Sequence, residues 1–288
     1  MELIRALGEL AEAPGPEQVR VARLLELPGE PTRAEYTELF VVQLYPYASV
    51  YLSPDGHLGG QVQEHIAAFW RVLREPVPRD PDHIATLFAT HAQLIRRAAD
   101  IAEPYMHELT LQMRHAFFWE HVASWMLPFL ARVGELGSAT YRGWGMLALD
   151  ALEAEAGQVG PPAQLPLQLR NAPPLPASGG IDALVDALFS PVRCGCILTR
   201  ADLSRCARDL GMNMRVAERR YTLRSLLGRD IARVSSWLAN ESRRQAEQMQ
   251  SGPAVFGEIA EHWSQRAVMT ADLLTRAVTH LEVQRRPQ

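Results

Sequence analysis

The chain has 288 residues, of which 47% are hydrophobic, and a formal net charge of -4. That content is enough to bury a sizeable core in one large domain or two modest ones. No run of 18 apolar residues occurs, so we expect no membrane span. The N-terminal MELIRALGEL lacks the parts of a signal peptide, which predicts a cytoplasmic protein. The odd set Cys194, Cys196 and Cys206 argues against a disulfide framework.

The charges are unevenly distributed along the chain, and all 29 basic residues are arginine. Residues 1–110 carry 16 acidic and 9 arginine side chains, a net charge of -7, whereas residues 193–244 carry 5 and 12, a net charge of +7. An acidic half favours basic partners, and a basic segment favours phosphate or an acidic surface. Alternatively, both are solvated faces that pair with each other within the fold.

Helical periodicity dominates the first half of the chain. Thr32-Arg-Ala-Glu35 forms a capping box that begins a helix toward Leu44, and glycines 56, 59 and 60 mark a loop. Further helices are expected over 62–73, from Asp80 or Pro81 to about Ala99, from Glu103-Pro104 onward, over 115–134 and over 138–154. We expect Pro128 to end or kink the 115–134 helix.

The second half begins with a change of composition. Proline and glycine dominate residues 155–180, which predicts a linker or a strap lying across the bundle. A second capping box, Thr199 to Asp202, begins a short helix that Gly211 ends, and long helices are expected over 215–249 and 254–284. The sequence therefore predicts an all-α multi-helix bundle in residues 1–155, a Pro/Gly-rich linker or strap in 156–180 and an additional helical C-terminal part in 181–288.

No pattern typical of catalysis or of metal binding accompanies these helices. His83 and His91 share a helical face but lie about 12 Å apart along the axis, too far for one ion. Neither HExxH nor paired Glu-x-x-His occurs, and Cys194, Cys196 and Cys206 lack a fourth zinc ligand. Phosphate-binding glycine motifs are absent, and without lysine there is no Walker-type clamp or Schiff base. We expect no catalytic residues, no metal, no cofactor and no enzyme activity.

The segment LTRADLSRCARDLGMNMRVAERRY, residues 198–221, offers an alternative function. A short helix, a Leu-Gly turn and a basic helix resemble a helix-turn-helix that presents arginines 215, 219, 220 and 224 to phosphate. A DNA-binding regulator using residues 198–224 is therefore the second hypothesis. The same apolar positions also fit an ordinary helical corner, and the charge is only locally basic, which disfavours nucleic acid as the partner.

Three blocks in the first half place aromatic rings beside carboxylates and histidines. They are YPYASVYL (45–52), PDHIATLF (81–88) and FFWEHVASWMLPFL (117–130). Aromatic walls with adjacent carboxylates suit a groove that buries an apolar peptide and pairs its arginines. The same rings would also serve as ordinary core residues.

The three blocks resemble the TorD/DmsD/NarJ-type chaperones that mature molybdenum-containing redox enzymes, over about residues 35–135. The resemblance implies an all-helical bundle of the TorD-like type, no catalysis, and binding of a twin-arginine signal peptide or of the apo form of a client redox-enzyme catalytic subunit. It makes Asp82 and His83 the best candidates for peptide recognition. His121 and Trp125 would line the same pocket, with Tyr47, Trp70 and Leu58 nearby, and Glu120 is our addition from its position beside them. The strap allows helix exchange in a homodimer.

Overall fold

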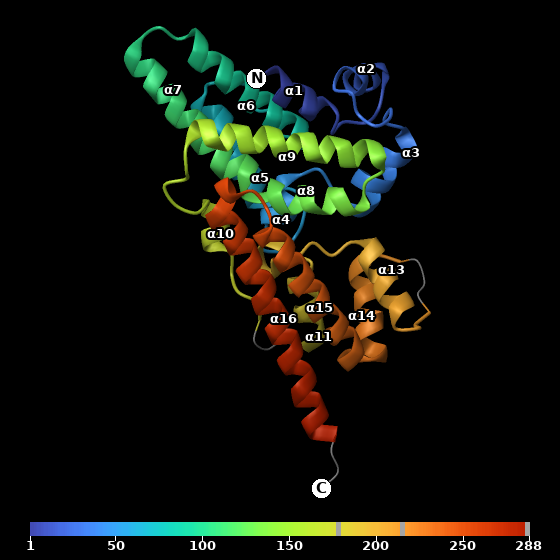
Figure 1. Ribbon diagram of the computed structural model, residues 1–288. Helices are drawn as coiled ribbons and strands as arrows, with labels where there is room; N and C mark the ends of the chain where they lie inside the picture. The colour runs from blue at the N-terminus through green and yellow to red at the C-terminus, as the bar shows by residue number, and fades with distance from the viewer. Residues whose placement is uncertain (177–179, 214–216, 286–288) are drawn as a thin grey trace.

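Helices make up the regular structure of this chain. The computed structural model describes residues 1–176, 180–213 and 217–285, with side chains up to residue 276. Within those residues the regular elements are helical, apart from an isolated bridge between Tyr47 and His83. The predicted all-α class is therefore confirmed. In Figure 1 the N-terminal bundle occupies one end of the molecule, and the C-terminal helices extend from it toward the chain end.

The N-terminal bundle packs α1 against α6 and α8 against α9 around one hydrophobic core. Its elements are α1 Glu2–Glu9, α2 Pro16–Leu24, α3 Arg33–Tyr36, the π-helix Thr37–Gln43, α4 Ala48–Leu52, α5 Gly60–Val72, α6 Ile84–Asp100, α7 Pro104–Phe117, the π-helix Phe118–Ala123, α8 Ser124–Leu136 and α9 Ala139–Val159. The predicted Thr32–Glu35 capping box is present, and α7 begins at Pro104, as predicted, with the Glu103 side chain as its cap.

The start of α6 differs from the expected one. The helix begins at Ile84, and the Nδ1 atom of His83 accepts a hydrogen bond from the N–H of Ala85 as its cap. Residues 80–82 stay outside the helix because the carbonyl of Asp82 and the N–H of Ile84 pair with the backbone of the 45–48 segment. Tertiary pairing therefore displaces the helix start that Asp80 or Pro81 would otherwise provide.

The proline-rich segment lies against the bundle as a strap and contains the short helix α10, Leu167–Asn171. The Trp119 indole N–H donates to the carbonyl of Gly160 at 2.9 Å, and the N–H of Leu167 donates to Glu120 Oε2 at 2.7 Å. Two side chains of the FFWEHVASWMLPFL block, Trp119 and Glu120, therefore hold the strap against the bundle.

The C-terminal part builds a second core. Its elements are α11 Gly180–Leu188, α12 Pro191–Cys194, α13 Arg200–Asp209, α14 Arg219–Arg229, α15 Ile231–Gln250, the 3₁₀ turn Ala254–Phe256 and α16 Gly257–Arg285. The long helix expected over 215–249 is two helices, because Asp230 caps α15 by accepting from the N–H of Arg233. Residues 214–216, which include Arg215, lie outside the described part.

The two parts share core residues. Ile259, Ala260 and Trp263, on the first turns of α16, belong to the N-terminal core, whereas Ala271 and Leu274 belong to the second core. A single helix therefore packs into both.

Of the two outcomes expected for Pro128, it does not end its helix, because α8 continues to Leu136; a kink there stays a prediction. A proline inside a helix has no N–H for the carbonyl four residues earlier, which here is that of Ser124. That carbonyl instead accepts a hydrogen bond at 2.9 Å from the indole N–H of Trp263, in α16. The C-terminal part supplies the partner that the proline removes.

A buried ion network joins the same two parts. The Arg132 side chain, on α8, is 1% exposed and donates to both carboxylate oxygens of Asp202, at 2.7 and 2.6 Å. Arg132 also pairs with Glu135, while Arg244 on α15 pairs with Glu135 and Glu241. Buried ion pairs of this kind are costly to break from one side, so the network fixes the C-terminal part on α8. No helix among the described residues is long and apolar enough to cross a membrane.

Candidate functional site

The loop between α4 and α5, residues 53–59, is held by a buried carboxylate. Asp82 is fully buried, and its Oδ2 accepts from the backbone N–H of Ser49 at 3.1 Å and from the Ser49 hydroxyl at 2.5 Å. Its Oδ1 accepts from the Gln63 amide at 3.0 Å. The Ser49 hydroxyl oxygen in turn accepts from the N–H of Gly59. Asp82 therefore ties α4, the loop and α5 together.

The same loop is fastened to the C-terminal part. The Ser190 hydroxyl donates to the carbonyl of Ser53 at 3.0 Å, and Arg220 Nη2 donates to the carbonyl of Asp55 at 2.8 Å. Gly56 has φ +67°, and a Cβ there would lie 1.9 Å from the carbonyl oxygen of Phe189. Only glycine fits this approach, which brings the loop against the end of α11.

Two hollows flank this loop and share His57 and Leu58 as lining residues. The smaller has a volume of about 430 Å³ and lies between the two parts of the chain; it is lined by Tyr45, Val50, Gly56, His57, Leu58, Phe189, Glu218, Arg219 and Arg220. The larger, of about 700 Å³, lies between the loop, the start of α5 and α10 in the strap. We call the two hollows together the loop groove.

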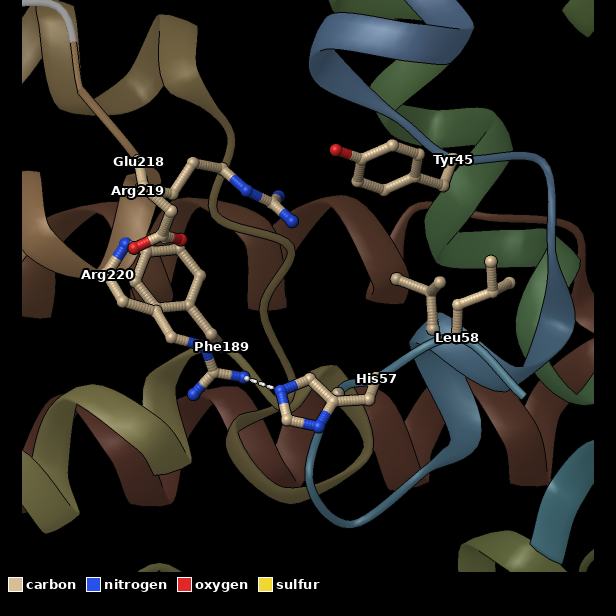
Figure 2. Close-up of a pocket in the computed structure, with 9 residues that line it drawn as sticks. Tyr45, His57, Leu58, Phe189, Glu218, Arg219 and Arg220 are labelled. Carbon is tan, nitrogen blue, oxygen red and sulfur yellow. Dashed lines mark hydrogen bonds between the residues drawn. The ribbon is translucent and has the colours of Figure 1, made fainter. Parts of the chain in front are cut away.

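Arg219 is the central charged group of the smaller hollow. Figure 2 shows Tyr45 and Arg219 projecting toward each other from opposite sides, with Leu58 and His57 on the side of the loop. The guanidinium carbon of Arg219 lies 5.5 Å from the ring centroids of both Tyr45 and Phe189, within cation–π range. Burial lowers the pKa of Arg219, although the nearby tyrosines and Glu218 oppose that shift.

The predicted recognition residues fall into separate environments. Tyr47 and His83 are neighbours, with ring centroids 4.8 Å apart, whereas Trp70, His121 and Trp125 lie in the core. Leu58 is 59% exposed and lines both hollows. Among the residues that the structure describes, those that line the two hollows do not include the other predicted residues. These are Tyr47, Trp70, Asp82, His83, Glu120, His121 and Trp125. Their role in peptide binding stays a prediction.

These residues nevertheless support the walls of the groove. Asp82 positions the loop, and Glu120 positions α10 through the N–H of Leu167. Trp125 stacks on Tyr51, whose hydroxyl donates to the carbonyl of Tyr45 at 2.8 Å. The first sequence block therefore lines the groove directly through Tyr45 and Val50, whereas the other two blocks support it through neighbouring residues.

His121 is buried among rings. Its ring lies 5.4 Å from that of His65, which lines the larger hollow, and 5.3 Å from that of Phe117. Burial, assisted by His65, lowers the pKa of His121 to about 3. The imidazole is therefore neutral at pH 7 and acts as an aromatic core residue.

Sequence reasoning missed the C-terminal wall of the groove, namely Phe189, Arg219 and Arg220. The sequence pattern indicates Arg219 and Arg220 only as basic residues of the DNA-binding hypothesis. Arg220 pairs with Asp186 at 2.6 Å, and Arg224 pairs with Asp182 at 2.5 Å. Arg220 and Arg224 are thus engaged in ion pairs within the chain, an arrangement that disfavours phosphate contacts by these two side chains. Arg215 lies outside the described residues.

The described residues contain no group of three or more histidine, cysteine or acidic side chains that could hold a metal ion. Cys194, Cys196 and Cys206 are free and buried. Cys194 and Cys196 pack beneath α16, where Gly195 has φ +71° and a Cβ would meet the backbone of Ala267 and Trp263. Cys194 and Cys196 therefore lie in the core beside α16, and Cys206, on α13, belongs to the same second core.

Comparison with known proteins gives a match over the N-terminal bundle. Residues 3–131 match the family model described as nitrate reductase delta subunit. This stretch runs from α1 into α8 and includes Tyr45, the loop and Asp82. No curated protein and no solved structure matches the chain.

Proposed function

We propose that the chain is a molybdoenzyme maturation chaperone, which holds the apo form of a redox-enzyme catalytic subunit during cofactor insertion. The match of residues 3–131 to the nitrate reductase delta subunit family supports this proposal, as do the sequence motifs. The client would be a molybdopterin or iron–sulfur oxidoreductase subunit, bound through its twin-arginine leader or another exposed segment. Chaperones of this kind bind without changing the client chemically.

The observation that carries this proposal is the loop groove. Its smaller hollow has apolar side chains from both halves of the chain, namely Val50, Leu58 and Phe189, and its larger hollow continues past the loop to the strap. An open, partly apolar groove of this size suits an extended or helical segment of another protein. The loop and Tyr45 also lie within the matched residues.

Apolar burial supplies enough free energy for reversible binding. Removing some 400 Å² of apolar client surface from water contributes about 10 kcal/mol at roughly 25 cal/mol per Å². Ordering the segment and losing its free motion costs several kcal/mol. The remainder corresponds to a Kd in the micromolar to sub-micromolar range, which permits release after cofactor insertion.

Asp82 and His83 enter the proposal as positioning residues. Asp82 holds the loop through Ser49 and Gln63, and His83 caps α6 and packs on Tyr47. A client segment in the groove would contact Leu58 and Tyr45, whereas Asp82 would act through the loop that carries Leu58.

The test uses a molybdopterin or iron–sulfur catalytic subunit from the same genome, which we expect to be encoded beside the gene for this chain. We expect calorimetry to show that its apo form binds and that its cofactor-loaded form binds at least tenfold more weakly. Removing the leader separates binding through the leader from binding through the client body. Equal affinity for the apo and loaded forms would contradict the proposal.

A pair of exposed leucines provides the matched variants. Leu58→Gln removes an apolar wall of the groove, whereas Leu24→Gln changes a leucine on α2 that is 70% exposed. We expect a loss of affinity in the first variant and none in the second. Equal behaviour of the two would place the client elsewhere on the molecule.

A further inference from the structure

Arg219 differs from the arginines that follow it on α14. Arg220 and Arg224 each have a carboxylate partner, in Asp186 and Asp182. Among the described residues, no carboxylate lies within ion-pair distance of Arg219. Its Nη1 donates to the carbonyl of Leu198 at 3.2 Å, and its guanidinium lies over the rings of Tyr45 and Phe189. A half-buried cation in this position lacks a counter-charge.

The surroundings of Arg219 favour an anion over a cation. Arg220 adds a second guanidinium to the lining of the smaller hollow. The one carboxylate there, Glu218, accepts from the backbone N–H groups of Arg220 and Tyr221, so it serves as the cap of α14. A positive charge in an apolar setting gains more from an opposite charge than it would in water.

The walls around the charge select for an apolar body next to the anion. Val50, Leu58 and Phe189 line the hollow together with the ring of Tyr45. A guanidinium pairs well with a carboxylate because its planar N–H groups match the two oxygens. The site therefore suits a carboxylate that is flanked by apolar groups.

We propose that the smaller hollow binds an acidic side chain of the client polypeptide, flanked by apolar residues, and that Arg219 pairs with that carboxylate. We assign the carboxylate to a polypeptide because of the shape of the groove. His57 and Leu58 line both hollows, so the site continues into a second hollow of about 700 Å³, which a small carboxylate would leave empty. This inference rests on the proposed chaperone function, and it assigns to the groove a contact opposite in charge to the arginines of a leader.

The test uses two short peptides, acetylated at the N-terminus and amidated at the C-terminus, that differ only in a side-chain carboxylate or amide. Each places one residue between leucine and phenylalanine: glutamate in one peptide and glutamine in the other. Ligand-observed NMR titration of the full chain should give at least tenfold tighter binding of the glutamate peptide. The Arg219→Met variant should bind both peptides equally, and Arg224→Gln, a change on the same helix outside the hollow, should retain the preference. Thermal melting of each variant checks that the fold is intact.

Three results would overturn the inference. The first is equal binding of the two peptides to the unaltered chain. The second is a preference for the glutamate peptide that persists in Arg219→Met. The third is binding of 4-phenylbutyrate as tightly as the glutamate peptide. The last would assign the site to a small carboxylate. The apo client then separates this inference from the proposed function: if it fails to bind the unaltered chain, the function is wrong, and if it binds that chain and Arg219→Met equally, the acidic contact alone is wrong.

Discussion

Replacing Asp82 with alanine should destabilise the fold and loosen the loop groove together. The Asp82 carboxylate is fully buried and accepts three hydrogen bonds, two from Ser49 and one from Gln63. Alanine would leave the buried N–H of Ser49 without an acceptor and would open a small cavity. Each unsatisfied buried group costs about 1–3 kcal/mol, and bonds to a charged acceptor are worth about 1.5–3 kcal/mol.

The expected loss in the free energy of unfolding is about 3–4 kcal/mol, since Gln63 is only partly buried and its amide can turn to water. Asp82→Asn keeps an oxygen for Ser49 and should lose about 1–2 kcal/mol. Asp150→Ala, on the exposed side of α9, is the matched control and should change stability by less than about 0.5 kcal/mol.

Urea unfolding followed by circular dichroism measures these differences, and hydrogen exchange of residues 53–62 reports on the loop. We expect faster exchange at Gly59, whose N–H donates to the Ser49 hydroxyl oxygen, together with weaker client binding. A variant that keeps its unfolding midpoint and its slow loop exchange, yet no longer binds the client, would refute this reasoning. It would show that Asp82 contacts the client directly.

Three further changes test other contacts. Trp263→Phe removes the donor to the carbonyl of Ser124, so urea unfolding should show a loss of about 1–3 kcal/mol, and an unchanged midpoint would exclude a stabilising role for this bond. Arg132→Met leaves the buried carboxylate of Asp202 without its main partner and should cost about 3–5 kcal/mol; a loss below 1 kcal/mol would mean that the network is solvated. Because burial lowers the pKa of His121 to about 3, its contribution to stability is complete above the unfolded pKa of about 6.5 and is lost as the pH falls toward 3. His121→Phe should therefore flatten the decline in unfolding free energy between pH 6.5 and 4 by up to about 1.4 kcal/mol per pH unit, and an equal slope in both proteins would contradict the neutral buried imidazole.

Local signals in the sequence predicted local structure well. The Thr32 and Thr199 capping boxes and the helix start at Glu103-Pro104 are all present, because each depends on residues within three positions of a helix start. The errors arose where distant segments intervene. The start of α6 depends on pairing with residues 45–48, and the continuation of α8 past Pro128 depends on Trp263, more than 130 residues later.

The candidate site was predicted less well than the fold. The sequence directed attention to the segments that build the groove, but it could not distinguish the residues that line it from those that support it. Asp82 and Trp125 are buried behind the wall, while Leu58 lines it. Phe189 and Arg219 were out of reach because their approach to Tyr45 depends on how the C-terminal part packs on the bundle. Spacing along the chain carries no information about that packing.

The buried contact between Arg132 and Asp202 has a consequence for any relative that lacks the C-terminal part. Without residues 181–288, an arginine at position 132 would lose its bidentate partner, and the Ser124 carbonyl beside Pro128 would face solvent. Chains without this part should therefore carry a neutral or apolar residue in place of Arg132, whereas chains that contain it should exchange positions 132 and 202 only as a pair. A genome survey can look for that covariation before any protein is purified.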